Sequence, residues 1–526
     1  MILNKSAIAA EKRKGKSMLL AVSKVCRVRP GLRSLALSAI AGSLMLLTAC
    51  TVGPNYVRPE ADTPGAYKEM EGWKKAQPGD NIIKGKWWEI FNDPELNALE
   101  EKVNISNQNV AAAEAQFRQA LAAVRAARSG YFPTVTADAS FTRSRQPVGA
   151  GGTTISGGTT SDFQLTGGAT WEPDLWGKIR RTVEAVEAGA QASAADLEAV
   201  RLSMQATLAQ DYFQLRTLDA QKRLLDETVI AYKKTLELTK NLYAAGVASK
   251  ADVLQAETQL KTTQAQAIDV GVQRAQTEHA IALLIGKPAS SFSSSVAPLT
   301  ATPPPIPVGV PSELLERRPD IAAAERSVAS ANAQIGVAEA AYYPTLTLTA
   351  SGGFQGTSLS NWLSWPNRLW SIGSAIAETV FDAGLRRAMT DEARAAYDAT
   401  VASYRQTVLT AFQDVEDNLA ALRILEEEAR VQEEAVNASQ KSLEVTMNQY
   451  KAGTVSYLNV IVAQTTKLNN ERTAVDISGR RMAASALLVK ALGGGWDAPA
   501  GRATAGSGVR NTPPHSAEAN ERRVGQ

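Results

Sequence analysis

Apolar residues recur every three or four positions through two long stretches of the chain that contain no proline. These stretches are residues 174–287 and 367–498, which comprise 114 and 132 residues. Because proline breaks a helix interior and this spacing places side chains on one helix face, the pattern predicts long amphipathic helices with a coiled-coil seam. The positions that show the spacing most clearly are Leu225, Val229, Tyr232, Leu236, Val408, Phe412, Val415, Leu419 and Leu422.

A single glycine interrupts each helical pattern. Gly246 and Gly453 stand just after the last apolar residue of a helical run. Glycine in this position ends helices, because it adopts the left-handed conformation without strain. Each stretch therefore predicts a helical hairpin that turns at the glycine and restarts near Ser249 or Ser456. The first helix, residues 177–243, would be about 100 Å long at 1.5 Å per residue.

Two shorter segments alternate strictly between polar and apolar residues. In residues 134–142, threonine, aspartate and serine occupy the even positions, and residues 345–351 repeat the pattern. Each segment is followed by a loop and a returning segment, so four strands in two hairpins are expected, with the returning strands at 162–171 and 369–380. The alternation fits a transmembrane strand with one face toward lipid, and it fits a half-buried strand of a soluble sheet. The period alone leaves both interpretations open.

Tryptophans beside the second hairpin favour the membrane interpretation. Trp362, Trp365 and Trp370 are clustered there, as in the aromatic belts of membrane proteins. An open four-stranded sheet cannot lie in a bilayer, however, because its edges would leave backbone groups unpaired in hydrocarbon. If these strands span a membrane, several chains must combine their strands.

The whole order of elements occurs twice. Residues 131–136, Tyr-Phe-Pro-Thr-Val-Thr, return as Tyr-Tyr-Pro-Thr-Leu-Thr about 211 positions later, and the tyrosine-to-glycine motif at 243–246 returns about 207 positions later. The pair Arg180-Arg181 also has a counterpart in Arg386-Arg387. A repeat of this length predicts a pseudo-symmetric, duplicated fold.

The first fifty residues have the features of an export signal. A basic region precedes an apolar run at residues 35–47, which is too short to span a membrane comfortably, so residues 1–49 are predicted to be a signal peptide. The ending Leu-Thr-Ala-Cys resembles a bacterial lipobox, in which cleavage leaves Cys50 as an acylated first residue. The alternative is that Cys50 is an ordinary buried thiol. The length of the basic region favours Met18 over Met1 as the start of translation.

Removal of the signal changes the charge balance of the chain. The formal net charge of the whole sequence is +3, but residues 1–49 contain nine basic residues and one acidic residue, so the mature chain carries −5. Its surface is therefore not expected to bind nucleic acid. Cys26, the only other cysteine, lies in the signal, which excludes a disulfide within one mature chain.

Composition divides the remaining chain into five segments. Residues 50–86 contain scattered prolines and are predicted to form a lipid-anchored, extended segment. The first structural repeat is assigned to residues 87–288, a Ser- and Pro-rich connector to 289–312, and the second repeat to 313–496. Residues 497–526 are rich in glycine, alanine and charge, and a disordered tail is expected there.

The chain lacks the residues from which an enzyme site is usually built. His279 and His515 are its only histidines, and no group of cysteine, histidine and aspartate has the spacing of metal ligands. We therefore expect no catalytic site, no metal site and no cofactor.

Short motifs extend in a fixed order along the chain. They are Cys-Thr-Val-Gly-Pro at 50–54, Trp-Trp at 87–88, Asp-Leu-Trp-Gly at 174–177, Arg-Arg-Pro-Asp-Ile at 317–321, Phe-Asp-Ala-Gly at 381–384 and Gln-Tyr-Lys-Ala-Gly at 449–453. Together they resemble the lipoprotein (NodT-type) branch of the TolC-like outer-membrane efflux proteins. The resemblance covers roughly residues 50–496.

This resemblance implies a mainly helical fold with a transmembrane β part. It implies a homotrimer in which four strands per chain form one 12-stranded barrel in the outer membrane, above a periplasmic tunnel of long helical hairpins. An adaptor protein would dock at the hairpin tips, whose turns are marked by Gly246 and Gly453. Thr51, in place of an aspartate after Cys50, is consistent with export to the outer membrane.

The resemblance also points to a gate at the tips. It implies that three copies of Leu458 close the pore as a hydrophobic ring. Asn459 and Val462 stand where many relatives carry acidic residues. The acid of this chain is Asp252, on the first tip, and both a pore role and a helix-capping role are open for it.

The predicted function is that of an outer-membrane exit duct in a tripartite efflux pump for small molecules. The implied partners are a periplasmic adaptor, an inner-membrane pump of the resistance-nodulation-division type and the lipids of the outer membrane. One alternative is a duct for type I protein secretion. Another is a lipid-anchored periplasmic adaptor, although adaptors have one hairpin between soluble β-domains, whereas here hairpin and strand pair are duplicated. The sequence does not identify the exported compound.

Overall fold

The computed structural model describes residues 51–69, 85–145, 159–299, 302–306, 308 and 317–495. The predicted signal peptide at 1–49, Cys50 and the predicted tail at 497–526 lie outside these residues. The chain divides into two compact units. The first contains residues 122–187 and 329–398 with the chain up to residue 57; the second contains residues 58–121, 188–328 and the chain from residue 399.

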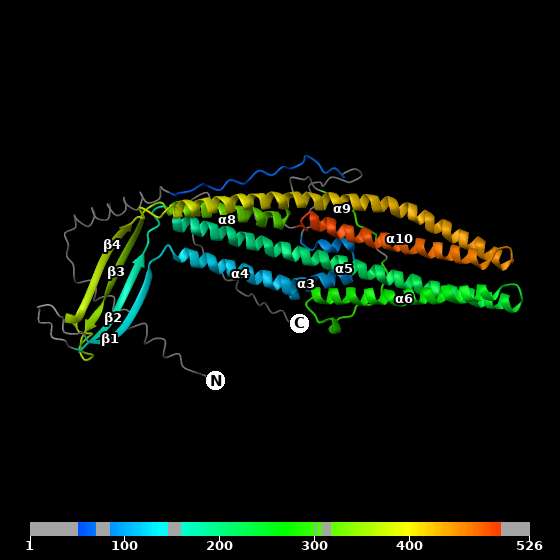
Figure 1. Ribbon diagram of the computed structural model, residues 1–526, viewed down its shortest axis with the longest axis horizontal. Coiled ribbons are helices and arrows are strands. Elements are labelled where there is room, and N and C mark those ends of the chain that lie inside the picture. Colours follow the sequence, from blue (N-terminus) through cyan, green and yellow to red (C-terminus); the bar gives the residue numbers. More distant parts are fainter. Residues whose placement is uncertain are drawn as a thin grey trace, which may run out of the picture. The chain divides into compact units, whose positions relative to one another are not determined.

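The first unit contains a four-stranded antiparallel sheet in the order β1-β2-β3-β4 (Figure 1). Its strands are β1 Thr134–Arg145, β2 Thr159–Trp171, β3 Thr345–Gly356 and β4 Arg368–Ala377. The two expected hairpins are confirmed, and β2 pairs with β3 to join them. β2 begins three residues before its expected start at 162, because the ladder with β1 continues to the pair Arg145 and Thr159.

A helix of 22 residues precedes each strand hairpin. These are α4 Gln108–Ser129 and α8 Pro319–Ala340. Each ends a few residues before a proline, Pro133 or Pro344, after which the strand begins. The equal lengths and the offset of 211 residues confirm the duplication.

The long helical hairpins follow the strands in each repeat. Helices α5 Lys178–Ala244 and α9 Leu385–Lys451 both have 67 residues, and α6 Lys250–Leu284 and α10 Tyr457–Ala491 both have 35. All four bounds repeat with an offset of 207 residues. In Figure 1, α5 and α6 form one hairpin, and α9 and α10 form the other.

The start of the first repeat packs against α5 in the second unit. The short 3₁₀ helix η2 Trp87–Phe91 buries both of its tryptophans, and Trp87 Nε1 donates to Gln205 Oε1 at 3.1 Å. Helix α3 Pro94–Ser106 follows, with Asp93 as its N-cap. A second 3₁₀ turn, η3 Ala289–Ser291, opens the connector. The buried aromatic side chains anchor this end of the repeat.

Within the described residues, no helix combines the length and the hydropathy that a membrane span requires.

Candidate functional site

The sheet of the first unit has a face of exposed apolar side chains. Directly paired residues share a face, so the register places odd residues of β1 and β2 beside even residues of β3 and β4. The large apolar side chains on this face of the edge strands are 58–79% exposed, namely Val135, Phe141, Trp370, Ile372 and Ile376. A soluble sheet covers such a face with other elements. The exposure therefore favours the lipid-facing interpretation of the alternation.

The opposite face of the sheet is polar. Ser351 and Ser371 share a hydrogen bond of 2.9 Å, and Gln355 Nε2 donates to Asp162 Oδ2 at 2.9 Å. Within the described strands, β1 and β4 each have one neighbour, so both edges of the sheet are open. A sheet with one apolar face, one polar face and two open edges can close around a polar lumen when other copies join it.

In the second unit, glycine forms the turn of each long hairpin. Gly246 and Gly453 have φ values of +75° and +72°. The amide after each glycine donates to a carbonyl five residues earlier, Val247 N to Leu242 O at 2.9 Å and Thr454 N to Gln449 O at 3.0 Å. This is the Schellman geometry that the glycines predicted. Their role as adaptor contacts stays a prediction.

The two tips differ in how the following helix is capped. At the first tip, Ser249 Oγ accepts from Asp252 N at 3.1 Å, and Asp252 Oδ2 accepts from Ser249 N at 2.9 Å, which is a capping box. At the second tip, Ser456 makes no side-chain cap. This geometry accounts for Asp252 as a helix cap, and its pore role stays a prediction. Asn459, its counterpart 207 residues later, is exposed.

Buried tyrosines join the two tips. Tyr457 is 1% exposed and its ring lies 5.4 Å from that of Tyr450, in a cluster with residues of α5 and α6. Tyr450 Oη and Thr239 Oγ1 are 3.4 Å apart, which links α9 to α5. Burial raises the pKa of both Tyr450 and Tyr457 above the ordinary value, so both rings stay neutral at physiological pH. The tips are therefore held together by apolar packing.

Only the second tip exposes an apolar stripe at the start of its returning helix. Leu458 and Val462 lie one turn apart on α10 and are 57% and 58% exposed. Their counterparts 207 residues earlier on α6 are Ala251 and Gln255. The structure thus places Leu458, Asn459 and Val462 together on the exposed side of α10. The constriction itself requires other copies of the chain and stays a prediction.

Residues 51–55 are held in the first unit at the start of α5. Arg181 is buried, and it donates from Nε to Val52 O at 3.1 Å and from Nη2 to Gly53 O at 3.0 Å. Val52 N donates to Trp176 O at 3.1 Å. The segment has no helix or strand, as the prolines suggested, but its first residues are bound rather than free.

Helix α8 completes this attachment. Asn332 Nδ2 donates to Pro54 O at 3.0 Å. Gly53 has φ +92°, and a Cβ added to it would lie 2.4 Å from Cα of Gly336. The two glycines therefore allow the backbones to approach as no other residue would. Arg181, Asn332 and Gly336 together are called the N-terminal clamp.

Comparison with known proteins agrees with this arrangement. The model of the family described as "Outer membrane efflux protein" matches residues 100–287 and 310–494, which lie in both repeats. The chain belongs to this family. The probable efflux pump outer membrane protein TtgC of Pseudomonas putida is 29% identical over 470 residues, which cover 89% of this chain and 97% of TtgC. The solvent efflux pump outer membrane protein SrpC of Pseudomonas putida is 30% identical over 457 residues, covering 86% and 97%.

Solved structures show the same fold. The outer-membrane channel OprN matches with a TM-score of 0.79 and 30% identity, covering 86% of this chain and 100% of that chain. This efflux protein is therefore a transport duct of the outer membrane and not an enzyme. Because the family match lies in two hairpins and two strand pairs, the adaptor alternative is set aside.

Sequence reasoning missed the tyrosine cluster and the clamp. Tyr450 stood in a repeated motif, but nothing marked Tyr457 as its partner, because the two rings meet across a turn at a tip that other helices also build. Arg181 was noticed only as half of a repeated pair of arginines. Its buried role depends on carbonyl groups about 128 residues earlier in the chain, for which no local pattern exists.

Proposed function

We propose that this efflux protein works as a homotrimer that forms the passive outer-membrane exit of a tripartite pump. The observation that carries the proposal is the amphipathic sheet with two open edges. Three copies would pair β1 of one chain with β4 of the next, which removes the edges and gives twelve strands around a polar lumen. A resistance-nodulation-division pump in the inner membrane would supply the energy.

In this proposal the hairpin tips form the closed end of the periplasmic tunnel. The apolar stripe of Leu458 and Val462 would meet its copies on the pore axis and exclude water from the constriction. An adaptor would bind near Gly246 and Gly453 and favour separation of the tips. The buried cluster around Tyr457 supports this mechanism, since apolar contacts can exchange partners without leaving charges unpaired.

The cargo that we propose is small organic compounds. The name of SrpC assigns solvents to a relative, and an apolar constriction puts no charged group in the path of such molecules. The test is accumulation of dyes, drugs and metal ions in a strain that lacks the gene, beside a complemented control. Build-up of the organic compounds supports the proposal. Build-up of metal ions alone would reassign the pump, and no build-up of any compound would direct attention to protein secretion.

We also propose that Cys50 carries the lipid. Its neighbour Thr51 is held beside the start of α5, where Arg180 Nη1 donates to Thr51 Oγ1 at 2.6 Å. Consecutive Cα atoms are about 3.8 Å apart, so acyl chains on Cys50 would start next to the junction of strand and helix. Cys50→Ser is expected to abolish acylation, measured as the loss of the lipid mass from the N-terminal peptide. Unaltered mobility of the wild-type protein after inhibition of lipoprotein processing would contradict lipidation.

A second prediction concerns the N-terminal clamp. Gly53→Ala is expected to release residues 51–55, because the methyl group would overlap Gly336 and the backbone would be strained at φ +92°. Strain of about 1–3 kcal/mol corresponds to an increase of about tenfold to 100-fold in hydrogen exchange of the Val52 amide. The matched control is Gly65→Ala in the same segment, where a Cβ meets nothing within 4 Å. Equal exchange in both variants would show that the clamp does not order the segment.

A further inference from the structure

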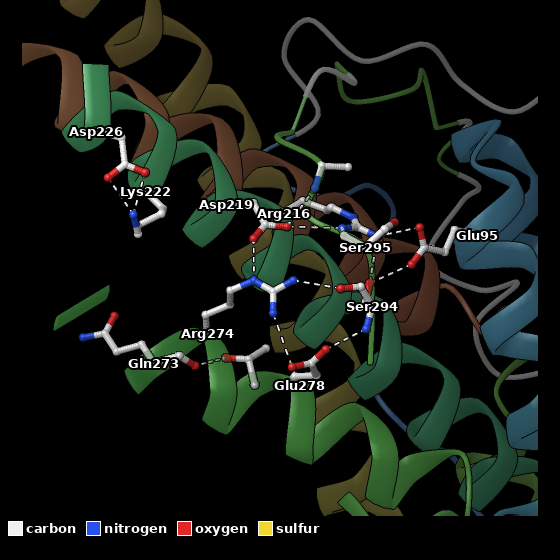
Figure 2. A network of polar contacts seen from close by, with 12 residues as sticks. Glu95, Arg216, Asp219, Lys222, Asp226, Gln273, Arg274, Glu278, Ser294 and Ser295 are labelled. Carbon is white, nitrogen blue, oxygen red and sulfur yellow. Dashed lines mark hydrogen bonds and ion pairs between the residues drawn. The ribbon is translucent and has the colours of Figure 1, made fainter. Parts of the chain in front are cut away.

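A buried charge network lies in the first repeat of the second unit (Figure 2). Asp219 is almost fully buried and accepts from Arg274 Nε at 2.7 Å and from Arg216 Nη1 at 3.2 Å. Glu95 of α3 is 2.7 Å from Arg216 Nη2, and Arg274 Nη1 is 3.3 Å from Glu278. Every charged group of the network is thus paired inside the protein.

The connector covers this network mainly with its backbone. Arg216 Nη1 donates to Ser295 O at 2.6 Å, and Arg274 Nη2 donates to Ser294 O at 2.9 Å. Ala297 N donates to Asp219 Oδ2 at 3.1 Å. Figure 2 shows the connector residues between Arg274 and Glu95. Because carbonyl and amide groups make these bonds, another segment of different sequence could make the same ones.

The second repeat conserves the core of the network. The offset of 207 residues converts Arg216 into Arg423 and Asp219 into Glu426. The same offset converts Arg274 into Arg481. The helices that carry them have identical lengths and bounds at this offset, so the three side chains occupy equivalent positions on α9 and α10.

The second copy is only half completed by the described residues. Arg423 pairs with Glu69 at 2.6 Å, as Arg216 pairs with Glu95 in the first repeat. Arg481 differs, because its Nε is buried and has no hydrogen-bond partner among the described residues. Ser485 replaces the acidic Glu278. A groove of about 770 Å³ lies beside these groups and is lined by Arg423, Glu426, Glu427, Arg430, Glu433 and Arg481.

We infer that residues 501–504 of the same chain occupy this groove. The offset of 207 residues aligns them with residues 294–297, which cover the first copy. The chain leaves both hairpins in the same way, since Gly286 and Gly493 have φ values of +67° and +93° and the following amides donate to carbonyls five residues earlier. The path that takes the connector onto the first network therefore takes the C-terminal segment onto the second.

The chemistry of groove and segment is compatible. Residues 501–504 are Gly-Arg-Ala-Thr, with mostly small side chains that leave the backbone free to bind. The groove is lined by three arginines and three glutamates, so it has no net charge that would favour a free ion. A carbonyl group from the segment would satisfy the buried Arg481 Nε, and an amide could donate to Glu426.

Site-specific maleimide labelling tests this assignment. Glu427→Cys, in the groove, is expected to react about tenfold more slowly in the full chain than in a chain that ends at Gly495, because the segment must open before the thiol reacts. Mass spectrometry of the peptide that contains residue 427 gives the rate. The matched control is Ala220→Cys, its counterpart beside the first network, whose rate should not depend on the truncation. Equal rates at residue 427 would overturn the inference, and so would an equal acceleration at both positions.

Cross-linking in the full chain identifies the occupant. A short bis-maleimide should join Glu427→Cys to Arg502→Cys within one chain, which leaves the denatured protein at the mass of a single chain. A product of two chains would show that a neighbouring copy fills the groove and would overturn the assignment. The absence of any product, with both thiols reactive separately, would do the same.

Discussion

Leu458→Ser is expected to raise the conductance of the closed channel in a planar bilayer by about tenfold. Burying a leucine side chain contributes about 2 kcal/mol, and each trimer would lose this contact in three copies. A shift of 1.4 kcal/mol already changes an open-to-closed ratio tenfold, so loss of even part of the contact is sufficient. The hydroxyl groups would also allow water to enter a constriction that apolar side chains keep dry.

The matched control for this experiment is Leu254→Ser. Leu254 lies on the first tip, and its exposure of 52% is close to the 57% of Leu458. We place it outside the proposed ring, since the position equivalent to Leu458 on α6 is Ala251. Its substitution should leave conductance unchanged. Equal conductance of Leu458→Ser and the wild type would refute the gate assignment, and an equal rise in both variants would reduce it to a general effect of polar tips.

The asymmetry between the tips gives the gate a physical basis. The two hairpins have the same helix lengths, yet the first tip carries a capping box at Ser249 and Asp252, whereas the second carries exposed Leu458 and Val462. A carboxylate that caps its own helix is already hydrogen bonded and is a weaker ligand for passing cations. The duplicated fold has therefore separated a tip that stabilises the hairpin from one that is suited to close a pore.

The helices could be predicted from sequence because their signals are local. Long runs without proline, followed by Gly246 or Gly453, give hairpins whose bounds agree with the structure to within a few residues. The strands were recognised by their alternation, but the period could not tell lipid from a soluble core. That decision needed the exposure of side chains such as Phe141 and Ile372, which depends on which elements cover the sheet.

The contacts that position the candidate site could not be predicted in this way. Tyr450 meets Thr239 across 211 residues, and Arg181 binds carbonyl groups about 128 residues away. Such pairs are set by the packing of whole helices, which no window of sequence contains. For Asp252 the sequence allowed two roles, and only the distances to Ser249 favoured the cap.

Gly493→Ala is expected to destabilise the folded chain by about 4 kcal/mol. The residue has φ +93°, where a side chain is strained by about 1–3 kcal/mol. Its Cβ would also lie 2.2 Å from Arg317 O, and relieving such an overlap by backbone shifts costs about 1–3 kcal/mol. The loss should appear as a lower midpoint of denaturant unfolding in detergent. Gly286→Ala should behave similarly, because its Cβ would lie 2.1 Å from Ser106 O at the equivalent turn.

Gly271→Ala is the control that separates these turns from a general intolerance of alanine. Gly271 lies inside α6, where a Cβ meets nothing within 4 Å, so alanine should stabilise the helix by about 0.5–1 kcal/mol. The opposite signs follow from one physical difference: in α6 the backbone already has helical φ, whereas the chain at Gly493 must turn left-handed and pass against another backbone. A Gly493→Ala protein as stable as the wild type would mean that the chain leaves α10 by a different turn.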